Sequence, residues 1–209
     1  AGLDLALSPK CFGELWIFRN LEEATLGALM QMADRQMHPK GSTIFLQGHE
    51  ADRMFLIKGG RVKLIKVTED GDEITIDIRK AGDVLGENVL NAKMTYPFTA
   101  WCMDDTLICG LSQETFEKLV MDHPAFGLQI IKNLSDRIEW LTSRVDSMRI
   151  SHLETRLYNI LLNVAREHGT RSEKGLAIGF PLTHEDLGFL VGAHRVSVTR
   201  ALKDLKSSG

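Results

Sequence analysis

The segment from Pro181 to Lys206 constrains the fold more strongly than any other stretch, because it has the pattern of a helix-turn-helix. Thr183 is a good helix N-cap, and Asp186, three residues later, can bond back to the backbone N–H of the cap residue. Gly192 interrupts the helical pattern where a tight turn is needed. The apolar residues at helical spacing on the two sides of this turn are Leu187, Leu190, Val191, Val196, Ala201, Leu202 and Leu205.

The second of these helices carries polar and basic residues away from its apolar positions. They are His194, Arg195, Ser197, Thr199 and Arg200. In the DNA major groove, arginine forms paired hydrogen bonds with guanine, and serine and threonine bond phosphates or bases. The segment therefore predicts DNA binding. The alternative is an ordinary helical hairpin with a solvated basic face, since look-alikes of this motif are frequent.

Charge is distributed unevenly along the 209 residues. The net charge is -3, but the chain has 17 basic and 22 acidic residues through Ser151, and 8 basic and 6 acidic residues after it. Positive charge confined to the C-terminal part favours DNA contact there rather than over the whole surface. Half of these eight basic residues lie in the segment 193–206, where Arg195, Arg200, Lys203 and Lys206 stand against the single acidic residue Asp204.

Composition favours a globular protein, with 44% hydrophobic and 25% charged residues. Neither a membrane-spanning run nor a signal-peptide pattern occurs, so we expect a cytoplasmic protein with no membrane partner. The three cysteines, Cys11, Cys102 and Cys109, form no CxxC pair, which argues against a disulfide framework or a zinc site. Phosphate-binding loops, nucleophile elbows and HExxH motifs are also absent, so we expect no enzyme activity.

Short strand patterns separated by glycines fill the stretch from Lys40 to Leu111. Apolar and β-branched residues alternate or run together between glycines that recur about every ten residues, as in an all-β sandwich or barrel. Asp70 and Gly71 tolerate positive φ angles, which favours a hairpin with a type I′ turn. This block predicts a β-roll or jelly roll.

Helical patterns return at Ser112, which can cap a helix, and Pro124 then opens a longer one. In the longer helix, apolar residues alternate at spacings of three and four, the a/d pattern of a coiled coil. We expect a dimer seam made by Ile131, Leu134, Ile138, Leu141, Val145 and Met148. The alternative is a helix that packs on its own domain. An amphipathic helix over His152–Glu167, a polar loop and a short strand over Leu176–Phe180 are expected to follow.

A glycine-punctuated β-roll, a long helix and a C-terminal helix-turn-helix, in this order, resemble the CRP/FNR family of bacterial transcription regulators. The likeness rests on GHEADRMFLIKGGRVKLIKVTEDGDEI, AGDVLGENVL, ETRLYNILLNVA and LTHEDLGFLVGAHRVSVTRALKDLK. It implies an α+β protein: an N-terminal jelly roll similar to cyclic-nucleotide-binding domains, a long dimerisation helix and a C-terminal winged helix-turn-helix. We place these parts at residues 1–123, 124–151 and 152–209. Relatives continue past the position of Gly209 into two wing strands, so the wing is expected to be truncated.

The resemblance also implies partners. Family members are homodimers that bind a palindromic operator, hold a small-molecule effector between the β-roll and the long helix, and act on RNA polymerase. The alternative is a cyclic-nucleotide-binding-like regulatory module without DNA function. Such a module shares the β-roll but lacks the helix-turn-helix.

The nucleotide cassette of the cyclic-AMP-binding members is present only in part. Gly86 and Glu87 match its Gly-Glu pair, in which the glutamate accepts a ribose hydroxyl. Thr99 keeps the hydroxyl of its Arg-Ser pair, but Phe98 stands where the arginine would pair with the phosphate. Because an unpaired buried charge is costly, we expect this protein not to bind cyclic AMP well.

The resemblance leaves the effector and any cofactor open. On the long helix Arg137, Leu141 and Thr142 match effector-facing positions, which allows an acidic metabolite. Alternatively, an aromatic ligand or haem could be lined by Tyr96, Phe98, Trp101 and Trp140, although each of these is individually more typical of a core residue. Candidate haem ligands are His38, His49 and His123. A lone Cys11 argues against the iron–sulfur cluster of other members.

The recognition helix can be compared residue by residue with the family. The base-facing positions are Arg195, Val196, Ser197 and Arg200, and the run Arg-Val-Ser-Val-Thr-Arg is most similar to that of the nitrogen-control (NtcA-type) members. We expect the two arginines to contact guanines and Val196 to contact a thymine methyl group. Phosphate contacts are expected from Ser197, Thr199 and Thr183, with His194 as a further DNA-contacting candidate.

Overall fold

The computed structural model describes residues 22–90, 95–173 and 175–207. The chain divides into two compact units. The N-terminal unit contains residues 1–73 and 77–136, and the C-terminal unit contains residues 74–76 and 137–209. The long helix α5 (Pro124–Met148) contributes residues to both.

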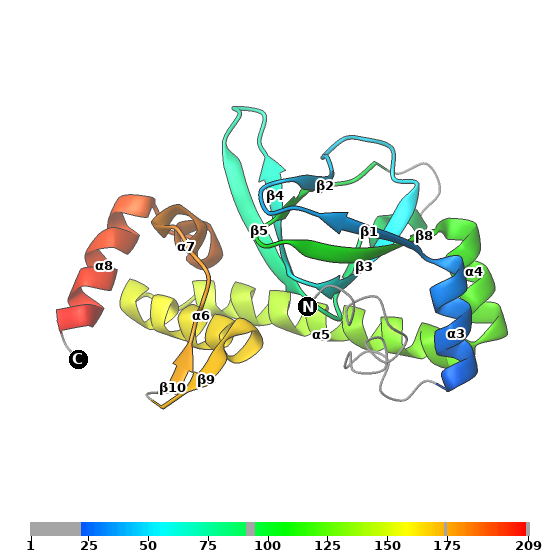
Figure 1. The fold of residues 1–209 in the computed structure, drawn as a ribbon. Coiled ribbons are helices and arrows are strands. Elements are labelled where there is room, and N and C mark those ends of the chain that lie inside the picture. The colour runs from blue at the N-terminus through cyan, green and yellow to red at the C-terminus, as the bar shows by residue number, and fades with distance from the viewer. Residues whose placement is uncertain (1–21, 91–94, 174, 208–209) are drawn as a thin grey trace. The chain divides into compact units, whose positions relative to one another are not determined.

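Two four-stranded antiparallel sheets form the β-roll (Figure 1). One has the order β1 (Asp34–His38), β8 (Thr106–Ser112), β3 (Arg53–Gly59) and β6 (Val84–Leu85). The other has the order β2 (Thr43–Phe45), β7 (Thr99–Cys102), β4 (Arg61–Val67) and β5 (Glu73–Lys80). Between β3 and β8, Leu56 pairs with Cys109, and both side chains are buried. The β-roll expected from the strand patterns is thus confirmed.

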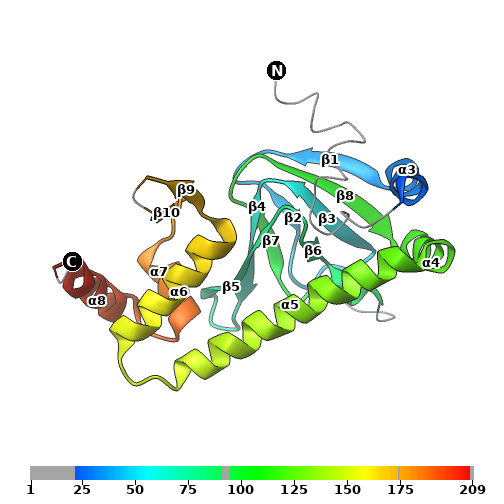
Figure 2. The same ribbon diagram turned by 90° about the horizontal axis from the view of Figure 1, so that it is seen from below.

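Helices close one end of the β-roll and complete its core. Figures 1 and 2 both show α3 (Glu23–Met32) beside α4 (Gln113–Asp122). Ser112 caps α4 as expected, because its hydroxyl accepts a hydrogen bond from the backbone N–H of Thr115 at 3.2 Å. Apolar side chains from both helices, from the strands and from the start of α5 form one cluster that includes Leu29, Leu56, Leu111, Phe116, Phe126 and Ile130.

The turn between β4 and β5 differs from the expected type I′ hairpin. The backbone N–H of Gly71 donates to the carbonyl of Thr68 at 3.0 Å, so Glu69 and Asp70 are the central residues. Gly71 follows them with φ of +86°. The expected turn centred on Asp70-Gly71 was therefore displaced by one residue. A second bond explains the shift, since the Thr68 hydroxyl accepts from the backbone N–H of Asp72 at 3.1 Å.

The C-terminal unit contains α6 (Leu153–His168), a small hairpin, α7 (His184–Val191) and α8 (Arg195–Ser207). A polar loop and a strand over Leu176–Phe180 were expected here; the strand has other bounds, and the loop contains a second strand. Part of the supposed loop is β9 (Thr170–Ser172), and it pairs with β10 (Gly175–Ala177), which ends before Phe180. All six strand residues are exposed. A ribbon with no buried face shows no apolar alternation, which is why the pattern search missed it.

Candidate nucleic-acid interface

A reciprocal cap fixes the start of α7. The Thr183 hydroxyl accepts from the backbone N–H of Asp186 at 3.0 Å, and the Asp186 carboxylate accepts from the backbone N–H of Thr183 at 3.0 Å. Asp186 is buried, so this bond is shielded from water. The capping box expected from the spacing of these two residues is confirmed.

The turn between α7 and α8 depends on two glycines. Gly192 ends α7 in the left-handed region with φ of +67°. The backbone N–H of Ala193 donates to the carbonyl of Gly188 at 2.8 Å, and a Cβ atom on Gly188 would lie 2.6 Å from the Ala193 oxygen. Only glycine permits this approach, so the turn fixes the angle at which α8 leaves α7.

Apolar side chains anchor α8 against α6 and α7. The buried residues are Leu157, Ile160 and Val164 on α6, Leu187, Leu190 and Val191 on α7, and Val198 and Ala201 on α8. The sequence pattern assigned one of these positions wrongly: Val196 was placed with the apolar residues, yet its side chain is 47% exposed, whereas Val198 is fully buried. Val198 lies three residues before Ala201 and seven before Leu205, the spacing of one helical face, so it and not Val196 continues the buried side of α8.

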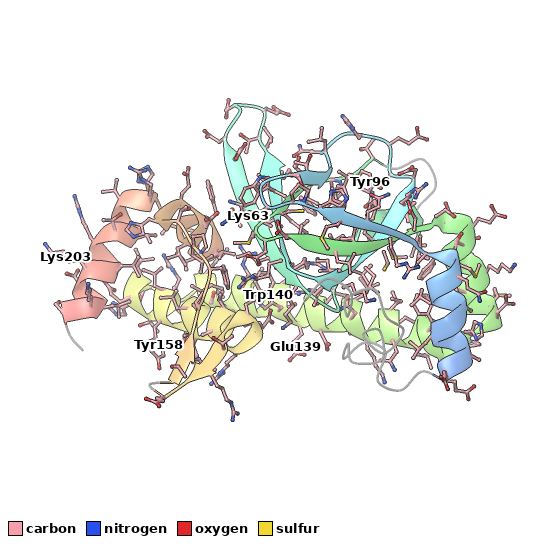
Figure 3. The ribbon with its side chains drawn as sticks, viewed as in Figure 1. Lys63, Tyr96, Glu139, Trp140, Tyr158 and Lys203 are labelled. Carbon is pink, nitrogen blue, oxygen red and sulfur yellow. The ribbon has the colours of Figure 1, made fainter. Side chains whose placement is uncertain are left out.

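The outward face of α8 carries the residues expected to contact DNA. All six of His194, Arg195, Val196, Ser197, Thr199 and Arg200 are exposed. Further along the helix, Lys203 also projects outward (Figure 3). His194 caps the helix, since its Nδ1 accepts from the backbone N–H of Val196 at 3.3 Å. Two arginines therefore stand free of the packing near the N-terminus of a well-anchored helix.

Thr183 and Thr199 have partners within the unit. Thr183 is exposed, and its hydroxyl donates to the Asp186 carboxylate at 2.7 Å. The Thr199 hydroxyl donates to the carbonyl of Arg195 at 3.0 Å and lies 2.8 Å from Nδ1 of His184. His184 was not among the expected site residues, because nothing in its local sequence distinguishes it from any other polar residue in a first helical turn.

Within the N-terminal unit, the Gly-Glu pair lies at the end of β6. Gly86 has φ of +72°, and a Cβ atom there would lie 2.8 Å from the Arg53 oxygen, so glycine is required. Glu87 begins a short 3-10 helix, and its carboxylate lies 3.9 Å from the guanidinium of Arg79. This buried arginine, which the sequence search did not single out, is paired with Asp77 at 2.5 Å.

The next two expected effector residues lie at β7. Phe98 is half-buried and carries no charge. The Thr99 hydroxyl accepts from the backbone N–H of Gln47 at 3.1 Å, so its proton remains available for another acceptor. The β-roll part of the cassette therefore offers a carboxylate and a hydroxyl.

The remaining three expected effector residues are on the part of α5 that belongs to the C-terminal unit. Arg137 is buried, with Nη1 3.7 Å from the carboxylate of Glu167. Leu141 is exposed. Thr142 is also exposed, and its hydroxyl donates to the carbonyl of Ile138 at 2.8 Å.

Comparison with known proteins agrees with this arrangement. Residues 35–123 match the cyclic nucleotide-binding domain, and residues 155–209 match the Crp-like helix-turn-helix domain. The chain is 29% identical over 196 residues to the global nitrogen regulator of Synechococcus elongatus, covering 93% of this chain and 86% of that protein. It is 25% identical over 193 residues to the CRP-like cAMP-activated global transcriptional regulator of Mycobacterium tuberculosis, covering 92% and 86%. The chain belongs to the CRP/FNR family of transcription regulators.

A solved structure supports the same assignment. The crystal structure of a CRP-family transcriptional regulator from Thermus thermophilus is similar to this chain with a TM-score of 0.69 and 26% identity, covering 83% of this chain and 85% of that one. The relatives of this CRP/FNR-family chain thus include a nitrogen regulator and a cAMP-activated regulator by name. Family membership alone does not specify the effector. No helix in the described part of the chain is long and apolar enough to cross a membrane.

The aromatic residues of this CRP/FNR-family chain have separate environments. Tyr96 is a core residue, stacked on Phe45 with ring centroids 4.0 Å apart. The Lys63 ammonium lies 5.2 Å from the ring centroid of Trp101. Trp140 is on α5 (Figure 3), and its ring centroid lies 4.8 Å from the guanidinium carbon of Arg144.

The histidines and cysteines have mostly structural surroundings. His123 bonds the Thr25 hydroxyl at 3.0 Å, His38 bonds Gln36 at 3.2 Å, and His49 is exposed. Among residues 22–90, 95–173 and 175–207, no group of three His, Cys, Asp or Glu residues could hold a metal ion. Cys102 and Cys109 are buried free thiols, and Cys11 lies outside the described residues.

The expected dimer seam is an exposed apolar strip on α5 in the single chain. Five of its six residues, Ile131, Ile138, Leu141, Val145 and Met148, have side chains that are 43–65% exposed. Leu134 instead packs partly against the core of the β-roll. Glu139, which follows Ile138 in the sequence, is an exposed residue of the same helix (Figure 3).

Proposed function

We propose that this protein is a homodimeric, effector-responsive transcription regulator that binds a palindromic DNA operator through α8. One observation carries the proposal: Arg195, Val196, Ser197 and Arg200 are exposed together on a helix whose opposite side is held by buried Val198 and Ala201. A rigid helix with arginines near its N-terminus suits the major groove. The family membership supports the same function.

Dimerisation is supported by the apolar strip on α5. A helix that packed only on its own domain would bury these residues, whereas five of them are exposed at coiled-coil spacing. Two copies joined along this seam would present two copies of α8 related by two-fold symmetry. Such a pair fits two inverted half-sites, and RNA polymerase is the further partner that the family implies.

The effector is proposed to be a molecule other than cyclic AMP. Phe98 brings no charge to the position that would face a phosphate, and the buried Arg79 is already paired with the Asp77 carboxylate. Displacing that carboxylate would separate the two members of a buried ion pair, which is costly. The effector candidates other than cyclic AMP are an acidic metabolite, an aromatic metabolite, and haem with a bound gas.

DNA binding is tested by fluorescence anisotropy with the full chain and duplexes selected from a random pool. We expect affinity to fall steeply as salt rises, because phosphate contacts release counterions. Binding that is absent at low salt would contradict the proposal and favour a regulatory module without DNA function.

Dimerisation is tested by native mass spectrometry, which also reveals a co-purified effector. We expect a dimer that dissociates in Ile138→Glu, while Met121→Glu, at an 80% exposed apolar residue outside the seam, remains dimeric. Isothermal titration calorimetry with cyclic AMP should show no binding in the micromolar range. An absorption spectrum of the purified protein distinguishes haem from a colourless metabolite.

A further inference from the structure

A histidine on α7 and a threonine on α8 are joined at the proposed DNA surface. Nδ1 of His184 lies 2.8 Å from the Thr199 hydroxyl, and both residues are exposed. The same hydroxyl lies 3.0 Å from the backbone carbonyl of Arg195. This small network belongs to the face that carries Arg195 and Arg200.

The protons in this network can be assigned from chemistry. A hydroxyl has one proton, and a carbonyl oxygen can only accept, so the Thr199 proton goes to Arg195. The bond between Thr199 and His184 must then be donated by Nδ1–H of the imidazole. Neutral His184 is therefore held in the tautomer whose Nε2 has a lone pair and no proton.

Two consequences follow for a phosphate at this surface. Thr199 has no proton left to donate, which departs from the phosphate contact that the family resemblance implied for it. Neutral His184 would also direct the lone pair of Nε2 at the phosphate, and this lone pair and the negative phosphate oxygen repel each other. Protonated His184 presents an N–H group and a positive charge instead, the combination that phosphate oxygens bind most strongly.

We propose that His184, positioned by Thr199, is a pH-dependent phosphate contact: it strengthens DNA binding when protonated and not when neutral. This inference rests on the proposed DNA-binding function. Because the DNA-bound state would hold more protons than the free state, affinity should rise as pH falls from about 8 to about 6, the range in which histidine changes charge.

Other charged groups surround this contact. Glu185 and Asp186 follow His184 on α7, and Asp186 is buried in the cap. On α5, Arg144 donates to the carbonyl of Phe189 in α7 at 3.4 Å. The other helices packed against α7 carry Glu154, Arg156, Arg166, Glu167 and His168 on α6, and Arg195, Arg200, Lys203, Asp204 and Lys206 on α8. His194 is a second histidine at this surface, but its Nδ1 accepts from the helix backbone, so its protonation would break a cap. A variant at position 184 separates the two histidines.

The test measures anisotropy of the full chain with a mixed-sequence duplex of about 30 base pairs, near pH 6 and near pH 8, over a salt series. A phosphate contact does not depend on base sequence, so no operator is needed. We expect wild-type binding roughly fivefold to tenfold tighter near pH 6, with a salt slope steeper by about 0.9 per protomer.

Three variants make the test specific. His184→Gln can still bond Thr199 but cannot become charged, so it should lose most of the pH difference and keep the affinity measured near pH 8. His184→Arg should bind near pH 8 as tightly as the wild type binds near pH 6. His152→Gln, at an exposed histidine just before α6 that makes no side-chain cap bond, should behave as the wild type.

The possible failures are distinguishable. Salt-dependent DNA binding with the same pH dependence in wild type and His184→Gln overturns the His184 contact and leaves the proposed function intact. No binding at either pH overturns both. Nitrogen NMR of the imidazole gives a readout without DNA: we expect the Nδ1–H tautomer in wild type and a mixture in Thr199→Val, whereas an Nε2–H tautomer in wild type would refute the assignment.

Discussion

Nε of Arg79 lies 2.5 Å from Oδ2 of Asp77, and both side chains are buried in the wall of the β-roll, 7% and 3% exposed. The same guanidinium donates to the carbonyl of Val84 at 3.0 Å, and the other oxygen of Asp77 accepts from the backbone N–H of Ile78 at 2.8 Å. The pair therefore ties β5 to β6 just before the Gly-Glu pair.

Replacing Arg79 by methionine should destabilise the N-terminal unit strongly. The change removes one member of a buried ion pair, which costs about 3–5 kcal/mol. Urea unfolding followed by tryptophan fluorescence measures the loss. Arg53→Met is the matched control, since its pair with Asp34 is 41% and 52% exposed and should be worth less than about 1 kcal/mol. Equal losses in the two variants would contradict this interpretation.

Gly188→Ala should disrupt the turn that sets the direction of α8. The added Cβ would lie 2.6 Å from the Ala193 oxygen, a contact that forces the backbone to move. We expect a loss of about 1–3 kcal/mol in thermal unfolding and weaker DNA binding. Gly27→Ala is the control, because nothing lies within 4 Å of its Cβ and alanine favours helix α3. A turn that tolerates alanine without loss would refute the close approach.

Arg200→Ala should weaken binding to a selected operator by about 1–3 kcal/mol and relax the preference for one base pair. The residue is exposed and has no role in holding α8, so stability should not change. Competition anisotropy with single-base variants of the operator measures both effects. Lys206→Ala, at the far end of the helix, should leave base preference intact. If Arg200→Ala binds the operator as tightly as the wild type, Arg200 does not contact a base.

Stability should fall at alkaline pH through the buried thiol of Cys109. Burial raises the pKa of this thiol to about 11, with smaller opposing contributions from the charges of Lys58 and Arg35. Because the pKa is higher in the folded state, the contribution is complete below the unfolded pKa near 9 and is lost as pH rises towards 11. Urea unfolding should therefore show a shallower pH dependence over this range in Cys109→Ala. A dependence identical to that of the wild type would contradict the shift.

Much of the fold could be predicted because its signals are local. Glycine spacing indicated the β-roll, Ser112 and Thr183 marked the starts of α4 and α7, and Gly192 marked the end of α7. Each of these depends on a backbone geometry that a few adjacent residues dictate.

The remaining features depend on contacts between distant residues or on the choice between two local solutions. Asp70-Gly71 fits two hairpin registers, and the hydroxyl of Thr68 favours the one observed. Both valines lie in the first turns of α8, and the helical spacing to Ala201 and Leu205 together with the packing against α6 and α7 places Val198, not Val196, in the core. The bond between His184 and Thr199 joins residues 15 positions apart on separate helices, so no sequence pattern indicates it.

On α8, the residues that pack against the domain are different from the residues that face outward, and this separation has an evolutionary consequence. Val198 and Ala201 hold the helix, while Arg195, Val196, Ser197 and Arg200 face outward and support none of that packing. Substitutions at these four outward positions cost the fold little, because exposed sites away from caps and cores tolerate change. A duplicated copy of this chain could therefore acquire a new set of target genes through a few point mutations, without first having to regain a stable domain.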